Sequence, residues 1–161
     1  MRIAVISDTH MPRGERRVPD ACAEALRAAD LIVHAGDFSD IEVLDWVESL
    51  GPPTVTVAGN VETAAVRERL PVEAEFSAEG HRVAVIHDAG PAKGRLSRMR
   101  RRFPEAEAVI FGHSHIPLHE ADQGFQIFNP GSPTERRRSP RHSFGIAEAT
   151  PESLSFRHVW L

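Results

Sequence analysis

The chain has 161 residues, the usual size of one domain, and a domain of this length buries about 70% of the surface that its unfolded form exposes. Its net charge of -4 argues against wholesale nucleic-acid binding, and its single cysteine, Cys22, excludes an internal disulfide. No stretch approaches the ~20 apolar residues of a membrane span, and the apolar start meets polar residues too early to provide a signal-peptide core. We therefore expect one soluble, cytoplasmic domain over residues 1–161, without a membrane partner.

The first third of the chain alternates between strand-like and helix-like segments. Runs of β-branched and other apolar residues predict three buried strands, at 2–7, 31–34 and 54–58. The helical spacing of apolar residues predicts one helix that begins at Pro19 and a second that Asp40 caps. Three strands separated by helices favour a parallel sheet.

After Pro71 the pattern changes to consecutive strands. We predict strands and one helix in this order: strands at 74–78 and 83–86, a helix at about 93–103, and strands at 108–111, 117–121, 125–128, 144–147 and 154–159. A turn at 129–132 follows the strand at 125–128. No internal repeat and no long linker divides the chain, which favours a single domain.

Residues able to bind metal follow the predicted strands in five short clusters. The seven residues are Asp8 and His10, Asp37, Asn60, His87, and His113 and His115. In an open α/β sheet ligands bind at the carboxyl ends of strands, so these side chains should converge. Within the Asp-x-His and His-x-His pairs, residues two apart in an extended segment face the same side. Glycine precedes three of the clusters, and glycine at 112 gives the turning backbone freedom to approach the ions.

Each candidate ligand has a simpler interpretation when it is taken alone. A lone aspartate at a strand end is more often a helix cap or a turn former, and a lone histidine usually lies on the surface or is hydrogen-bonded in the core. Asn60 after glycine would by itself be a turn residue. The joint pattern favours a two-metal hydrolytic site, because such a site needs a bridging carboxylate with imidazole and carbonyl donors from several strands.

The order of these clusters over nearly the whole chain resembles the calcineurin-like metallophosphoesterase superfamily, and specifically its small bacterial and archaeal phosphodiesterase branch. The motifs that carry the resemblance are Asp8-Thr9-His10, Gly36-Asp37, Gly59-Asn60, His87, Gly112-His113-Ser114-His115 and Asn129-Pro130-Gly131-Ser132. The resemblance implies an α/β fold, a four-layer α/β/β/α sandwich in which two mixed β-sheets are flanked by helices. It also implies two divalent metal ions per chain. One ion would be held by Asp8, His10, Asp37 and His115, and the other by Asp37, Asn60, His87 and His113.

The function implied by the resemblance is a metal-dependent phosphodiesterase that acts on a small or nucleotide-like phosphodiester. A hydroxide that bridges the ions would attack phosphorus, and Asp37, His10 and Asn60 are the expected catalytic residues. Oxygen and imidazole ligands without a thiolate suit Mn²⁺, our expected ion, with Fe, Ni or Zn as alternatives. A catalytically silent protein-binding scaffold of the same fold remains an alternative. A nuclease that uses the arginine-rich surfaces is a weaker one, since the short loops offer no obvious nucleic-acid channel.

The sequence does not assign a role to four features of the chain: Val61, Glu62, Asp88 and the arginine-rich segments. Many superfamily phosphatases carry a histidine directly after the ligand asparagine, where this chain has Val61, and the following Glu62 suggests a helix cap. Asp88 stands where many relatives have glycine, and it suits either a partner of a ligand histidine or a loop cap. The arginines within 95–102 and 136–141 suit a solvated face better than a rim that attracts anions or a contact in a homo-oligomer.

Overall fold

The computed structural model describes residues 1–161 and contains two five-stranded sheets. The first sheet has the strand order β10-β9-β1-β2-β3. Its strands are β1 (Arg2–Ile6), β2 (Leu31–His34), β3 (Thr54–Thr56), β9 (Ser143–Thr150) and β10 (Ser153–Trp160). β1, β2 and β3 run parallel, as the strand–helix alternation predicted, and β9 pairs antiparallel with β1.

Helices α1 (Asp20–Arg27) and α2 (Ile41–Glu48) connect the parallel strands of the first sheet. Pro19 directly precedes α1, and the side chain of Asp40 caps α2 by accepting a hydrogen bond from the backbone N–H of Glu42 at 3.3 Å. Both predicted helix starts are therefore confirmed. Cys22 is buried on α1 among apolar side chains, as expected.

The second sheet has the order β4-β5-β6-β8-β7 and is also mixed. Its elements are β4 (Glu73–Ala78), β5 (His81–Ile86), α4 (Arg95–Arg102), β6 (Ala108–Ile110), β7 (Leu118–Asp122) and β8 (Phe125–Asn129). β5, β6 and β8 are parallel, and the two edge strands run antiparallel to their neighbours. A short helix that the sequence did not predict, α3 (Ala64–Arg69), precedes this sheet.

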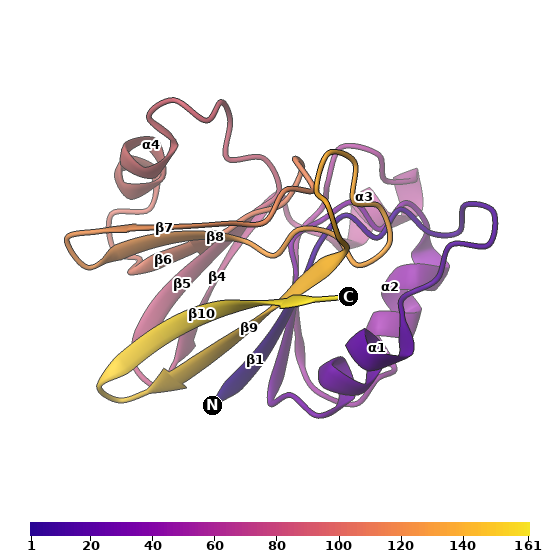
Figure 1. Cartoon of the computed structure of the whole chain (residues 1–161), viewed down its shortest axis with the longest axis horizontal. Helices are drawn as coiled ribbons and strands as arrows, with labels where there is room; N and C mark the ends of the chain where they lie inside the picture. Colours follow the sequence, from indigo (N-terminus) through magenta and orange to yellow (C-terminus); the bar gives the residue numbers. More distant parts are fainter.

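Three hydrophobic clusters show how the layers pack. The central cluster fills the space between the sheets with residues such as Val33, Val85 and Phe128. A second cluster packs α1, α2 and α3 against the first sheet, and a third packs α4 against the second sheet through Met99 and Phe103. Figure 1 shows α1 and α2 on one side of the two sheets and α4 on the opposite side. The predicted four-layer α/β/β/α sandwich is confirmed. None of the helices is long and apolar enough to cross a membrane.

Most arginines of α4 bind other parts of the chain. Arg95 and Arg98 donate hydrogen bonds to backbone carbonyls in the loop 89–91. Arg100 donates to the carbonyl of Asp122, and Arg102 pairs with the carboxylate of Glu73. These contacts connect the helix to the preceding loop and to both edge strands of the second sheet. The arginine cluster on α4 is therefore largely structural rather than a freely solvated face.

Candidate metal centre

All seven candidate ligands lie on loops that leave the carboxyl ends of strands. β1, β2 and β3 of the first sheet lead to four of them, and β5 and β6 of the second sheet lead to the other three: Asp8, His10, Asp37 and Asn60, then His87, His113 and His115. The loops are tied together, since Asp8 N donates to Gly36 O at 2.9 Å and Gly112 N donates to His87 O at 2.9 Å. Both sheets therefore contribute side chains to one place.

The backbone of five candidate ligands adopts the left-handed region. The φ angles are 58° at Asp8, 45° at His10, 61° at Asp37, 68° at His113 and 60° at His115. The expectation that each pair faces together because its backbone is extended is therefore wrong. The pairs converge because the chain turns sharply after each strand, and Asp and His are among the residues that tolerate this conformation best.

Three glycines allow the loops to approach one another, because a β-carbon at these positions would collide with the site. At Gly112 it would overlap the hydroxyl of Ser7, and at Gly59 it would overlap the carboxylate of Asp37. At Gly36, whose φ is +89°, a β-carbon would lie 2.7 Å from Nδ1 of His87. The backbone of Gly112 needs no left-handed φ, so its role is the missing side chain and not the conformational freedom expected from the sequence.

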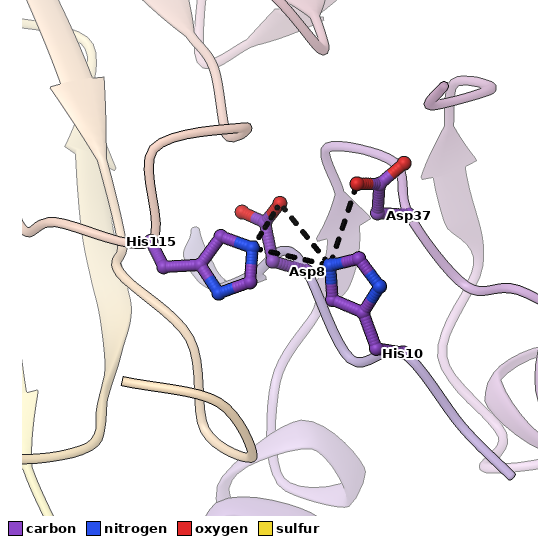
Figure 2. A group of neighbouring side chains, drawn as sticks. All are labelled: Asp8, His10, Asp37 and His115. Atoms are coloured by element: carbon purple, nitrogen blue, oxygen red, sulfur yellow. Dashed lines mark hydrogen bonds and ion pairs between the residues drawn. The ribbon is translucent and has the colours of Figure 1, made fainter. Parts of the chain in front are cut away.

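A first group of side chains is buried and compact. The ligand atoms of Asp8, His10, Asp37 and His115 all lie within 4.8 Å of one another, and Figure 2 shows the four side chains pointing toward one another. Nε2 of His115 is 3.1 Å from Nε2 of His10 and 3.3 Å from Oδ1 of Asp8. At most 7% of each of these residues is exposed.

A second group lies beside the first and is more open. Oδ1 of Asn60 is 3.0 Å from Nε2 of His87 and 2.9 Å from Nδ1 of His113. His87 is buried, His113 is half-buried and Asn60 is exposed. A ligand from solvent therefore reaches the centre most directly on the Asn60 side.

Asp37 connects the two groups through one oxygen. Its Oδ1 accepts hydrogen bonds from the backbone N–H groups of Asn60 at 2.7 Å and Val61 at 3.1 Å. Its Oδ2 is left facing both groups, 3.4 Å from Nε2 of His10 and 3.3 Å from Nε2 of His87. The structure thus brings all seven predicted residues together, with Asp37 in the middle.

Backbone carbonyls fix the orientation of two histidine rings. Nδ1 of His87 donates to the carbonyl of Ala35 at 2.7 Å, and Nδ1 of His115 donates to the carbonyl of Glu135 at 2.6 Å. With a proton on Nδ1, each neutral ring presents the lone pair of Nε2 to the centre. Such a contact to the far ring nitrogen is usual for histidines that bind metal.

The donor set and its spacing fit divalent cations. Metal–ligand bonds of about 2.0–2.2 Å at angles between octahedral and tetrahedral place neighbouring donor atoms about 2.8–3.6 Å apart. The contacts of His115 with His10 and Asp8, and those of Asp37 with His10 and His87, measure 3.1–3.4 Å. Facing acceptor atoms at these separations repel one another unless a proton or a cation lies between them.

Burial favours the uncharged form of each ionisable side chain at the site, and neighbouring opposite charges favour the charged form. Burial raises the pKa of Asp8 to about 7, and it lowers the pKa of His115 to about 4. Burial also acts to raise the pKa of Asp37, but the hydrogen bond and the charge of His87 bring it down to about 2. For His87, the contact with Asp37 and the charge of Asp8 outweigh burial and raise the pKa. Asp37 and His87 therefore stabilise each other's charged form across the 3.3 Å contact between Oδ2 and Nε2.

Glu62 supports the centre in a way that the sequence did not reveal. The sequence suggested a helix cap, but Thr63 occupies that position of α3. The buried carboxylate of Glu62 instead accepts backbone hydrogen bonds from Phe38 at 3.1 Å, Ser39 at 2.8 Å and Gly59 at 2.9 Å. It therefore joins the loop of Asp37 to the loop of Asn60.

Other polar residues fix the remaining loops. Asn129 donates to the carbonyl of Gly112 at 2.7 Å, and the hydroxyl of Ser132 donates to the carbonyl of Asp8 at 2.8 Å. His34 is fully buried, and burial lowers its pKa to about 3, so the neutral ring accepts from Gly36 N at 3.2 Å. Asp88 accepts from Gly90 N at 2.7 Å, which makes it a loop cap. The sequence pointed to two of these roles, through the motif at 129–132 and through the loop cap considered for Asp88, and it gave no signal for His34.

Comparison with known proteins agrees with the site. The calcineurin-like phosphoesterase superfamily domain matches residues 1–152. A probable metallophosphoesterase of Methanothermobacter thermautotrophicus is 36% identical over 143 residues, which cover 85% of this chain and 80% of that protein.

Two solved structures share the fold. Vps29 of Entamoeba histolytica, complexed with zinc, has a TM-score of 0.79 at 19% identity and 99% coverage of both chains. A structure described as a novel archaeal phosphodiesterase has a TM-score of 0.74 at 18% identity and 100% coverage of both. The extent of the domain match and the identity to the Methanothermobacter protein show that this chain belongs to the calcineurin-like phosphoesterase superfamily.

Proposed function

We propose that the protein is a metal-dependent phosphodiesterase that hydrolyses a small or nucleotide-like phosphodiester. The observation that carries this proposal is the position of Asp37 Oδ2, 3.4 Å from His10 Nε2 and 3.3 Å from His87 Nε2. A single carboxylate oxygen facing two sets of imidazole donors suits a bridge between two cations. The name of the archaeal phosphodiesterase with the same fold supports the reaction class.

The two groups of side chains divide the ligands in this proposal. Asp8, His10, Asp37 and His115 would hold one ion, and Asp37, Asn60, His87 and His113 would hold the other. Oxygen and imidazole donors without a thiolate suit Mn²⁺, with Fe, Ni or Zn as alternatives. Two bound cations would supply an acidified water for attack on phosphorus and would neutralise charge on the phosphoryl oxygens.

The protein's own contribution is to position the ligands before the substrate arrives. Backbone N–H groups hold Oδ1 of Asp37, and backbone carbonyls hold the rings of His87 and His115. Asn60 and His113 lie on the open side, where a phosphate group would enter. No side chain would have to act as the nucleophile, because bound cations would supply the attacking oxygen from water.

A preference for activated aryl diesters over alkyl monoesters follows from the residue beside Asn60. Val61 has 42% of its surface exposed, and it cannot donate a proton to a departing alkoxide. A positioned general acid contributes about 10²–10⁴-fold to rate, so its absence favours substrates whose leaving group needs no proton. Activated diesters such as aryl phosphodiesters meet this requirement.

The test is a reconstitution of metal-free protein. Purified protein is stripped with a chelator, reloaded with Mn²⁺, Zn²⁺, Ni²⁺ or Fe²⁺, and assayed with bis(4-nitrophenyl) phosphate and 4-nitrophenyl phosphate while bound metal is counted. We expect two ions per chain and faster hydrolysis of the diester than of the monoester. Failure of every metal form to hydrolyse the diester would refute the proposed function.

A protein-binding scaffold is the second candidate, favoured by the likeness of the fold to Vps29. The zinc complex of Entamoeba Vps29 means that metal binding alone cannot separate the two candidates. The same assay separates them, because a scaffold would bind metal without accelerating hydrolysis above that of the free ions. A nuclease would instead cleave single-stranded DNA with a steep dependence on salt.

A further inference from the structure

A cleft of about 310 Å³ opens directly beside the second group of ligands. Asn60 and His87 line the cleft as well as the centre. The lining of the cleft is apolar at Val72 and Ile86 and polar at Asp88 and Arg102. A phosphate held at the centre would therefore have one of its substituents next to this cleft.

The charges around the cleft disfavour an anionic substituent. Arg102 is the only cationic residue that lines it, and its guanidinium already pairs with Glu73 at 2.7 Å. Asp88 is exposed and adds a carboxylate to the same wall. A second phosphate at this place would find no unpaired positive charge and one negative charge.

The apolar wall favours a flat hydrocarbon surface. Val72 is 69% exposed, the largest exposed fraction among the exposed large apolar residues of the chain. Ile86 lines the cleft from the end of β5, next to His87. A ring laid against Val72 would remove apolar surface of both partners from water, which an isolated methyl group would do far less.

We propose that this cleft is a subsite for a neutral aromatic substituent of the phosphodiester, such as an aryl group or a nucleobase-bearing arm. The inference rests on the proposed function, and it narrows the substrate class to diesters with one flat, uncharged arm. Val72 is then a specificity-determining residue that contacts the substrate away from the reacting atoms.

Binding of phosphonates tests the subsite without hydrolysis, because their P–C bond is not cleaved. Calorimetry on Mn²⁺-loaded protein should give a Kd for phenylphosphonate about tenfold below that for methylphosphonate, the effect of covering about 60 Å² of apolar surface. Val72→Asp should reduce this ratio to about one, and Val72→Ala should reduce it in part. Ile116→Asp is the matched control, since Ile116 is another exposed apolar residue but does not line the cleft, and it should keep the ratio.

The outcomes separate the subsite from the proposed reaction. Three results would overturn the subsite. They are equal Kd values for the two phosphonates, no binding of either phosphonate, and a ratio of the two Kd values that Val72→Asp leaves unchanged. Tighter phenylphosphonate binding that depends on Val72, without any hydrolysis of an aryl diester, would support the subsite and overturn the phosphodiesterase. Hydrolysis of an aryl diester together with equal Kd values for the two phosphonates would support the phosphodiesterase and overturn the subsite.

Discussion

Gly59 lies so close to Asp37 that a β-carbon on residue 59 would overlap Oδ1 of the aspartate. We therefore expect Gly59→Ala to displace the carboxylate and to lower metal content and diester hydrolysis together. The matched control is Gly124→Ala, where φ is +78° and no atom lies within 4 Å of the added carbon. That control should lose about 1 kcal/mol of stability from backbone strain but keep its metal. Metal analysis and thermal unfolding of both variants check the prediction, and full metal content in Gly59→Ala would contradict it.

Substitution of Glu62 should weaken the centre without touching a ligand. Glu62→Gln places an amide NH₂ where one carboxylate oxygen now accepts backbone hydrogen bonds, so one or more buried N–H groups lose their acceptor. The expected loss of stability is about 1–3 kcal/mol, with reduced affinity for the ion nearest Asn60. Denaturant unfolding and metal titration measure the two effects. Glu68→Gln, an exposed position on α3, is the control and should change neither.

Asp37 and Asn60 should differ in their effects on metal content. Asp37→Ala removes the oxygen that faces both groups, so we expect less than one ion per chain and no hydrolysis. Asn60→Ala removes one neutral donor, and the buried first group should keep its ion. Elemental analysis distinguishes the two, with Asp20→Ala, an exposed position on α1, as the control. Equal and complete metal retention in Asp37→Ala and Asn60→Ala would show that the ligand assignment is wrong.

Metal affinity should fall as the pH drops below about 7. Burial raises the pKa of Asp8 to about 7, and the contact with Asp37 raises the pKa of His87, so both groups hold protons at a higher pH than usual. A cation needs the ionised carboxylate and the neutral imidazole, so each bound proton must leave when metal enters. Affinity should therefore rise with pH until both groups are deprotonated and then level off. Calorimetry in buffers of different ionisation enthalpy counts the released protons, and zero release at pH 6 would contradict the prediction.

Val61→His should add the general acid that the chain lacks beside Asn60. The exposed position of Val61 lets an imidazole reach the open side of the centre. Hydrolysis of alkyl esters should increase more than hydrolysis of 4-nitrophenyl esters, whose leaving group needs little protonation. Rates with a matched alkyl and aryl pair test this. If the unmodified protein already cleaves alkyl monoesters as fast as aryl diesters, another acid must be present.

The sequence was sufficient to predict the framework and the seven side chains that come together at the candidate site. The β-branched runs before Asp8, Asp37 and His87 end where the strands end, and the change from alternating to consecutive strands after Pro71 marks the second sheet. Seven donors at strand ends were expected to converge, and they do. These features are visible because each depends on residue type and on neighbours along the chain.

The features that the sequence did not reveal depend on contacts between distant segments. Glu62 looked like a local helix cap, and only the fold shows that its carboxylate reaches Phe38 and Ser39. Gly112 looked like a flexible turn, although the reason for glycine is the hydroxyl of Ser7, which directly follows β1. Helix α3 is six residues long and lacks a side-chain cap, so little in its sequence marks it as helical.

The left-handed backbone at five candidate ligands lowers the stability of the fold at the positions that would bind metal. Each such residue other than glycine destabilises the native state by an amount of order 1 kcal/mol, and a domain of this kind is stable by only about 5–15 kcal/mol. Substitution by glycine would relieve that strain but would also remove the five donor side chains, those of Asp8, His10, Asp37, His113 and His115. The protein therefore folds with less stability than its architecture permits. A tightly bound cation, which stabilises only the native state, is the natural means of offsetting the loss.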